Sequence, residues 1–210
     1  EYQASKSGES LFAILKQNKL IALYALIMTL YWGDYGQYGY RMPLDMGQIH
    51  GDRGALIYGS ISSLNSITVV LFTPILTRVF RNMVSTKKCI TGQSLLMVGF
   101  LCFLSFRGII PAYYIAMFLF TLGEIMSTFV EGPYLTQRIP ASHRGRINGV
   151  MSIAQSVLQG IMTLVVGGLY DKASPAVAWS FVLVILAVAI CLTLVLIPTD
   201  KRRYPALYTK

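Results

Sequence analysis

The sequence predicts an all-α membrane protein, a bundle of six transmembrane helices. Its composition gives the first two reasons: 54% of the residues are hydrophobic and only 13% are charged, with a mean hydropathy of +0.56. An ordinary soluble domain is about one quarter charged. The third reason is that six apolar segments each approach the roughly 20 residues that a helix needs to cross a bilayer. These segments are residues 20–40, 55–79, 89–106, 111–135, 147–169 and 177–197.

Lysine and arginine residues are distributed unevenly between the connections of these segments. Of the 18 in the chain, only Arg41, Arg53, Arg107 and Lys172 fall on one side. The positive-inside rule makes the richer side cytoplasmic, so we expect a multi-pass protein of the cytoplasmic membrane with both ends of this chain in the cytoplasm. The net charge of +9 does not indicate nucleic acid, because six spans leave no folded polar face to bind it.

The remaining segments are short. Residues 1–16 are polar and are expected to be a cytoplasmic linker from a preceding half, residues 17–200 the six-helix bundle, and residues 199–210 a basic cytoplasmic tail. Cys89, Cys102 and Cys191 occur singly in apolar segments, without the spacing of metal ligands, and are expected to be small core residues. No metal or other cofactor is expected.

The sequence matches itself at an offset of 90 residues, which aligns Asp34 with Glu124. The same offset pairs Gly33 with Gly123, Pro43 with Pro133, Gly59 with Gly149, Ser62 with Ser152, Asn65 with Gln155 and Ser66 with Ser156. The two repeats, about 17–106 and 107–198, contain three helices each, so the second is expected to run inverted across the membrane. Transporters of this design place substrate and ion sites near the midplane, where helices are broken. A glycine before each acid and a proline after it predict broken or bent helices.

Glu124 and Glu131 are the most unusual residues of the fourth segment. Glu124 is expected roughly 17 Å from the cytoplasmic end of its helix, about mid-bilayer, and Glu131 roughly 6 Å from that end. Because an intramembrane acid costs about 2.5–3.5 kcal/mol or more, both are expected to face the protein interior or a cavity. Glu124 is a candidate for proton exchange. Asp34, its partner in the repeat, is a second candidate, and Glu131 is a third, with pairing to Arg138 as the alternative for Glu131.

The first segment carries further polar residues on one face, Asp34, Gln37 and Arg41. Asp34 and Arg41 are candidates to pair with the glutamates. Tyr35 and Tyr38 are interpreted either as pocket residues or, for Tyr38, as an interfacial anchor. The second and fifth segments each contain one of the amides Asn65 and Gln155. We expect these amides either to form hydrogen bonds between helices or to line a cavity.

Three stretches of the chain resemble the second half of a major facilitator superfamily transporter, helices 7 to 12. They are "YGSISSLNSITVVLFTPILTR", "TLGEIMSTFVEGPYLTQRIPASHRGRINGVMS" and "GGLYD". The Gly-Glu of the tenth helix, and Pro140, Arg144, Gly145 and Arg146 before the eleventh, are similar to the drug-and-proton antiporter branch. The resemblance implies half of a major facilitator fold, whose other six helices supply the rest of the cavity.

The resemblance further implies an alternating-access carrier driven by protons and monomeric as a twelve-helix protein. The loop "TRVFRNMVSTKK" departs from the family pattern because it lacks the Asp and Gly of the usual gating motif. Arg78 and Arg81 remain candidates for gating contacts with acidic helix ends.

The sequence therefore predicts a proton-coupled secondary transporter that exports lipophilic compounds, with membrane lipid, a small-molecule substrate and an N-terminal half as partners. A proton-coupled importer of peptides or other small solutes is the alternative, because "SSLNSI" and "GEIMS" also resemble oligopeptide transporters. An intramembrane enzyme is a remote alternative, because no nucleophile or ligand set accompanies the two carboxylates. The identity of the substrate is not predictable from the sequence.

Overall fold

A computed structural model describes residues 18–208 of the chain; the expected linker at 1–16 and the terminal Lys210 lie outside the described residues. Six long helices account for most of the described part. They are α2 (Lys19–His50), α3 (Gly54–Val79), α4 (Ser85–Ser105), α5 (Ile110–Thr136), α6 (Ala141–Lys172) and α7 (Pro175–Arg203), with two short 3-10 turns, η1 (Gly51–Arg53) and η2 (Pro205–Leu207). The all-α prediction is confirmed, and each of the six apolar segments falls on its own helix.

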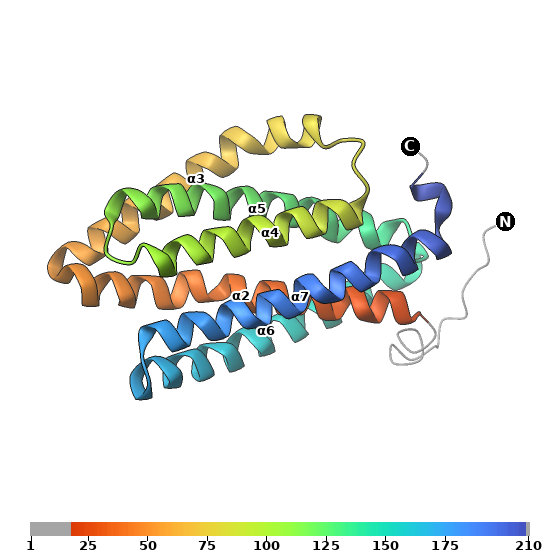
Figure 1. The fold of residues 1–210 in the computed structure, drawn as a ribbon. Coiled ribbons are helices and arrows are strands. Elements are labelled where there is room, and N and C mark those ends of the chain that lie inside the picture. The colour runs from red at the N-terminus through yellow and green to blue at the C-terminus, as the bar shows by residue number, and fades with distance from the viewer. Residues whose placement is uncertain (1–17, 209–210) are drawn as a thin grey trace.

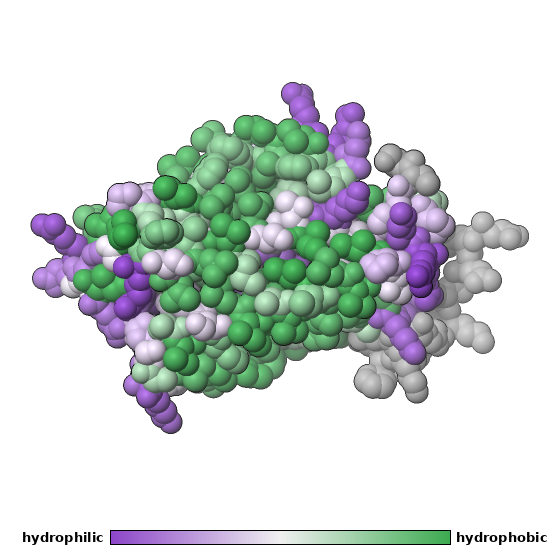
Figure 2. All heavy atoms as spheres, in the orientation of Figure 1, coloured by the Kyte–Doolittle hydropathy of each residue, from purple (hydrophilic) through white to green (hydrophobic). Residues whose placement is uncertain are grey.

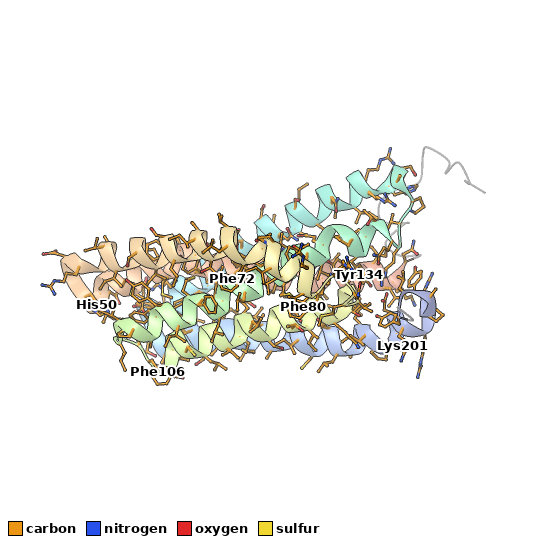
Figure 3. The ribbon with its side chains drawn as sticks, turned by 90° about the horizontal axis from the view of Figure 1, so that it is seen from above. His50, Phe72, Phe80, Phe106, Tyr134 and Lys201 are labelled. Carbon is orange, nitrogen blue, oxygen red and sulfur yellow. The ribbon has the colours of Figure 1, made fainter. Side chains whose placement is uncertain are left out.

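The helices run side by side along one direction and reverse at each connection (Figure 1). The start of α2, the α3–α4 and α5–α6 connections and the end of α7 lie at one end of the bundle, which we call the basic end. The opposite end carries the other connections; Figure 3 places His50 and Phe106 there, away from Lys201. The alternation of connections expected from the charge count is therefore present in the fold.

The surface of the bundle is apolar in its middle and polar at both ends. Figure 2 shows a broad hydrophobic band between two groups of hydrophilic side chains. Five stretches of the described chain are long and apolar enough to cross a membrane; the first, Lys19–Val79, joins α2 and α3 through η1. These properties fit a multi-pass membrane protein.

Helix packing divides the bundle into two similar groups. α2 packs against α6 and α7, while α5 packs against α3 and α4. α4 and α7 also contact each other and join the two groups, and α2 contacts α3. As a result, α3 and α6 lie on the outside of the bundle and α2 and α5 near its centre.

Glycines allow α4 and α5 to cross closely. A Cβ atom on Gly123 would lie 2.6 Å from the Gly92 carbonyl oxygen, and one on Gly99 would lie 2.9 Å from the Phe120 Cβ atom. Such distances leave no space for a side chain, so small residues bring the two backbones together. Phe100 and Phe120 pack edge to face beside this crossing, with ring centroids 5.3 Å apart.

Of the two expectations, broken or bent helices, the break is wrong, and the bend stays a prediction. Pro43 lies inside α2 and Pro133 inside α5, and both helices continue without interruption through the glycine-acid pairs. A proline removes one backbone donor and crowds the preceding turn. Packing of α2 against three neighbouring helices, and the position of Pro133 within the last turn of α5, explain why each helix continues past its proline.

Two exposed apolar stripes run along the outer helices. Ile67, Leu71 and Ile75 repeat every four residues on α3, and Val157, Ile161 and Val165 do so on α6. Residues four apart lie on one helix face. The two sets are separated by the same 90-residue offset that relates Asp34 to Glu124.

Candidate functional site

Glu124 lies near the middle of α5 and accepts a hydrogen bond from α3. Asn65 Nδ2 lies 2.8 Å from Glu124 Oε2 and 2.9 Å from Thr121 Oγ1. The Thr121 hydroxyl in turn donates to the Met117 carbonyl one helical turn earlier. The Tyr35 hydroxyl of α2 is close enough to interact with the same carboxylate. The Glu124 carboxylate therefore lies among neutral groups of α2 and α3.

Glu131, two turns further along α5, has different neighbours. Trp32 Nε1 of α2 donates to Glu131 Oε2 over 3.2 Å, and Gln155 Nε2 of α6 donates to Glu131 Oε1 over 2.9 Å. Glu131 thus joins α5 to α2 and α6, whereas Glu124 joins α5 to α3. The amides Asn65 and Gln155, which the repeat aligns, each bind one glutamate.

Arg138 does not bind Glu131; it forms a buried ion pair with Asp200 at the end of α7. The guanidinium atoms Nε and Nη2 lie 2.8 and 2.6 Å from the two carboxylate oxygens, and both side chains are 0% exposed. The guanidinium also covers the Tyr134 ring at 3.9 Å. Tyr208 donates to Asp200 over 2.7 Å, and burial raises the pKa of Tyr208 to about 12. The alternative of a Glu131–Arg138 pair is therefore wrong.

Asp34 is fully buried, and neither of its carboxylate oxygens has a hydrogen-bond partner within residues 18–208. Gln37 is also fully buried and donates to the Gly33 carbonyl over 3.3 Å, while its Oε1 has no partner there. Arg41 binds Asp171 at 3.3 Å, so neither Asp34 nor Arg41 pairs with a glutamate. That part of the sequence hypothesis is wrong.

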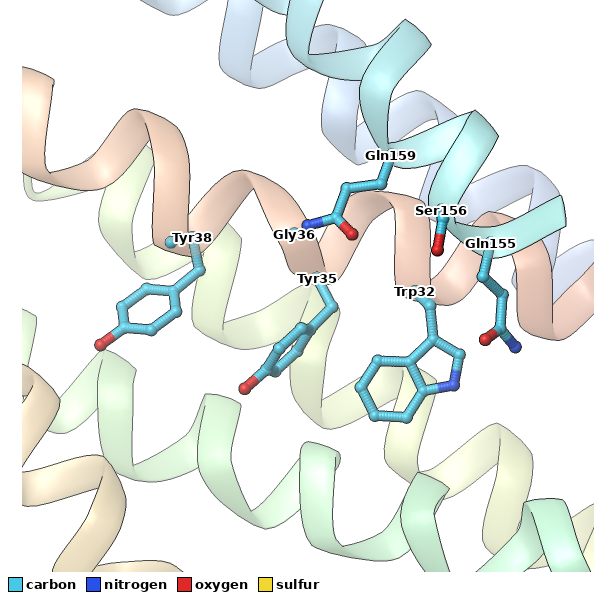
Figure 4. A pocket seen from close by; sticks show the side chains of 8 residues that line it. Trp32, Tyr35, Gly36, Tyr38, Gln155, Ser156 and Gln159 are labelled. Atoms are coloured by element: carbon cyan, nitrogen blue, oxygen red, sulfur yellow. The ribbon is translucent and has the colours of Figure 1, made fainter. Parts of the chain in front are cut away.

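A pocket of about 450 Å³ opens between α2 and α6 (Figure 4). Its lining residues are Trp32, Tyr35, Gly36, Tyr38, Gly39, Gln155, Ser156 and Gln159. The pocket therefore contains three of the predicted cavity residues, while Gln37, Arg41 and Asn65 lie outside its lining. The rings of Trp32, Tyr35 and Tyr38 form one wall in Figure 4, and the amides of Gln155 and Gln159 lie opposite.

Sequence reasoning missed Ser156 and Gln159 as lining residues. They lie one and four positions after Gln155, and helical spacing places Gln159 on the face of α6 that Gln155 occupies. Gly36 leaves space for the Gln159 side chain, because a Cβ atom on residue 36 would overlap Gln159 Nε2. Gly36, in the stretch "YGQYG", was therefore the sequence feature that could have indicated the close approach of α6.

A second polar cluster closes the end of the bundle opposite the basic end. Arg107, in the α4–α5 connection, places Nη2 2.6 Å from Asp45 Oδ1, and Tyr170 of α6 also donates to Asp45. Hydrogen bonds to Asp45 raise the pKa of Arg107. The Arg41 guanidinium lies 3.5 Å from the centre of the Tyr170 ring. This cluster joins α2, α6 and the α4–α5 connection, and no sequence pattern indicated its partners.

The loop residues of the basic end divide into two kinds. Arg78 and Arg81 are exposed and form no ion pair within the described residues. Arg144 donates to the Ile139 carbonyl over 3.0 Å and to the Thr136 carbonyl over 2.6 Å, so it satisfies acceptors at the end of α5.

The other loop-motif residues have simpler positions. Pro140 precedes the first turn of α6, and Gly145 and Arg146 are exposed within that turn and the next. The motif "PASHRGR" therefore forms the start of α6, with Arg144 directed back to α5.

Within residues 18–208 no group of three or more His, Cys, Asp or Glu side chains is arranged to hold a metal ion. Comparison with protein-family models and with curated proteins found no match to this chain. Fold and site together define an all-α protein with helices long and apolar enough to span a membrane, and with carboxyl groups in its apolar middle, of which Asp34 is buried and Glu124 and Glu131 are partly exposed. The more particular assignment is a proposal.

Proposed function

We propose that this chain is the carboxy-terminal six-helix half of a proton-coupled secondary transporter of the major facilitator type, which exports lipophilic compounds by alternating access. The observation that carries the proposal is the setting of Glu124, near the middle of an apolar helix and held by neutral groups alone. Membrane insertion, with the basic end in the cytoplasm, is part of the proposal.

Among the described residues Glu124 accepts from the neutral amide of Asn65 and forms no ion pair, so protonation would leave no cation unpaired. A carboxylate locked to an arginine, as Asp200 is, would pay heavily for protonation because it would leave a buried cation unpaired. Glu124 instead accepts from an amide of α3. A shift of α3 relative to α5 would break that hydrogen bond and change the balance between its two protonation states.

Asp34 supplies the contrasting case. An enclosed carboxyl group without partners is far more stable in its neutral form, because an isolated buried charge is costly. A conformational change that opened α2 to water would allow it to ionise, so Asp34 is the second candidate for proton exchange.

The helix packing supports the inverted repeat on which the proposal depends. The 90-residue offset relates α2 to α5, α3 to α6 and α4 to α7. The contacts of α2 with α6 and α7 therefore correspond to those of α5 with α3 and α4, whereas the contact of α6 with α7 has no counterpart of similar extent between α3 and α4. Equivalent packing is expected of two copies of one three-helix unit.

The pocket beside Glu131 supports lipophilic compounds as the substrate class. Three aromatic rings give it large apolar faces, and the Trp32 indole and the Gln155 amide connect its wall to the Glu131 carboxylate. Aromatic faces and a nearby acid also favour cationic members of the class. An N-terminal half would complete the cavity and cover the stripes on α3 and α6.

Proton movement in liposomes tests the proposal. The complete transporter is reconstituted with a pH-sensitive dye trapped inside, and lipophilic cations and short peptides are added outside. Movement of protons opposite to the added compound is expected. Movement of protons together with peptides would replace the exporter with the importer, and no response to any compound would contradict proton coupling altogether.

A further inference from the structure

The loop between α3 and α4 lies between two hollows at the basic end of the bundle. One, of about 440 Å³, has Lys87 and Lys201 in its lining; the other, of about 500 Å³, has Arg81 and Lys88. Residues 82–84 line both hollows. We call these two adjoining hollows the loop hollows.

The lining of the loop hollows is positively charged and uncompensated. It contains four cations and no acidic residue. None of the four belongs to an ion pair within the described part of the chain, where the three acidic partners bind Arg41, Arg107 and Arg138. An anion entering the hollows would therefore meet several charges that no ion pair among residues 18–208 neutralises.

The start of α4 adds donors to the same place. Val84 supplies no side-chain cap, and the first turn contains no acidic residue. Ser85, which lines the larger hollow, is only 7% exposed. Free amides and an enclosed hydroxyl next to cations form a setting suited to a phosphate group.

Apolar surface lies next to the hollows. Ile197 belongs to the lining of the smaller hollow. Further towards the middle of the bundle, Val98 of α4 and Leu194 and Val195 of α7 are 42–58% exposed. A ligand with a charged head and long apolar chains would satisfy both surfaces, whereas a free phosphate would use only the first.

We infer that the loop hollows bind the headgroup of an anionic phospholipid, whose acyl chains lie along α4 and α7. Basic pockets between helices at the cytoplasmic face are a recurrent way of holding such headgroups. This inference rests on membrane insertion of the chain and not on transport, so it survives if proton coupling fails.

Lipid retention tests the inference. The complete protein is reconstituted in vesicles of equal parts phosphatidylcholine and phosphatidylglycerol, extracted in a non-ionic detergent, and its bound phospholipid is identified by native mass spectrometry. Retention of phosphatidylglycerol in preference to phosphatidylcholine is expected. Arg81→Ala combined with Lys201→Ala removes one exposed cation from each hollow and is expected to weaken retention about thirtyfold.

Arg202→Ala combined with Arg203→Ala is the matched control, because it removes two exposed cations of the same end that line neither hollow. The control is expected to retain phosphatidylglycerol like the wild type. Equal loss in both double variants would show diffuse attraction rather than a site and overturn the inference. So would displacement of the lipid by equimolar inorganic phosphate, which would indicate a free-anion site, or retention of both lipids alike.

Discussion

The two glutamates in the middle of the bundle have partners that differ in kind from those of the acids at its ends. Glu124 and Glu131 accept from amide and indole groups, whereas Asp45 and Asp200 are bound by arginines. An arginine partner binds an ionised carboxylate more strongly than a neutral donor does. This difference predicts which acids can change their protonation state.

Glu124→Gln tests that role. The glutamine oxygen can still accept from Asn65, so the fold is expected to persist, but the side chain cannot exchange a proton. Gradient-driven transport in liposomes is expected to fall to background, while exchange of labelled for unlabelled substrate continues. Glu124→Asp, which keeps a titratable group, is the control and should retain partial transport. Wild-type uphill transport by Glu124→Gln would exclude the role proposed for this residue.

Glu131→Gln is expected to separate recognition from coupling. Its amide oxygen can accept from Trp32 or Gln155, but the negative charge beside the pocket disappears. We expect binding of lipophilic cations to weaken about tenfold, equivalent to about 1.4 kcal/mol, with neutral compounds of similar shape unaffected. Equilibrium binding to the purified protein measures both. An equal loss for charged and neutral compounds would indicate collapse of the pocket instead.

Helix ends are held by contacts of very different strength. The Arg138–Asp200 pair joins the end of α5 to the end of α7 with both side chains fully enclosed, while Asp171, which pairs with Arg41, is 74% exposed. Removing one partner of a buried pair leaves an uncompensated charge. Exposed pairs contribute about 1 kcal/mol at most.

Arg138→Ala or Asp200→Ala is therefore expected to destabilise the protein by about 3–5 kcal/mol, and the double variant by less than the sum of the two. Asp171→Ala is the comparison and should destabilise less than either of these variants, because Asp171 itself is 74% exposed although Arg41 is only 6% exposed. Thermal unfolding in detergent measures all four variants. Additive losses in the double variant would mean that the two side chains act independently.

The α4–α5 crossing depends on the absence of side chains. Gly123→Ala would force its new methyl group against the Gly92 carbonyl, and a cost of about 1–3 kcal/mol is expected. Gly132→Ala, in the same helix, meets nothing within 4 Å and should be neutral or stabilising by about 0.5–1 kcal/mol. The same unfolding assay distinguishes them, and equal effects would show that helix propensity, not close approach, explains both glycines.

For the whole molecule, the orientation of the bundle is open to direct measurement. In a variant lacking Cys89, Cys102 and Cys191, a single cysteine replaces either Lys172 or Arg146, both exposed and at opposite ends. A membrane-impermeant maleimide added to whole cells is expected to label position 172 alone, and position 146 only after permeabilisation. The reverse pattern would place the basic end outside the cell.

Hydropathy predicted where helices occur but not where they end. The first predicted segment stops at residue 40, whereas α2 continues to His50 because Asp45, which interrupts the apolar run, is bound by Arg107 and Tyr170. Those partners come from distant parts of the chain, and no local pattern identifies them. The end of α2 was therefore beyond the reach of sequence reasoning.

Spacing along α5 predicted the common face of Glu124 and Glu131 but not their partners. Arg138 is the nearest basic residue in sequence to Glu131. Arg138 nevertheless binds Asp200, because the end of α5 lies beside the end of α7. Likewise, "YGQYG" predicted a polar, aromatic stretch, while the pocket depends on how α6 approaches it. Choice among possible partners is a property of packing, which one sequence does not contain.

The stripes on α3 and α6 have a mechanical consequence in the proposed twelve-helix protein. A second body resting on these two ridges is supported along two lines, with α2 and the pocket in the space between them. Contact along two lines resists sliding across them but permits tilting about an axis between them. The second body would then tilt about the two stripes, so that tilting in one direction opens the pocket towards one end of the bundle and closes it towards the other.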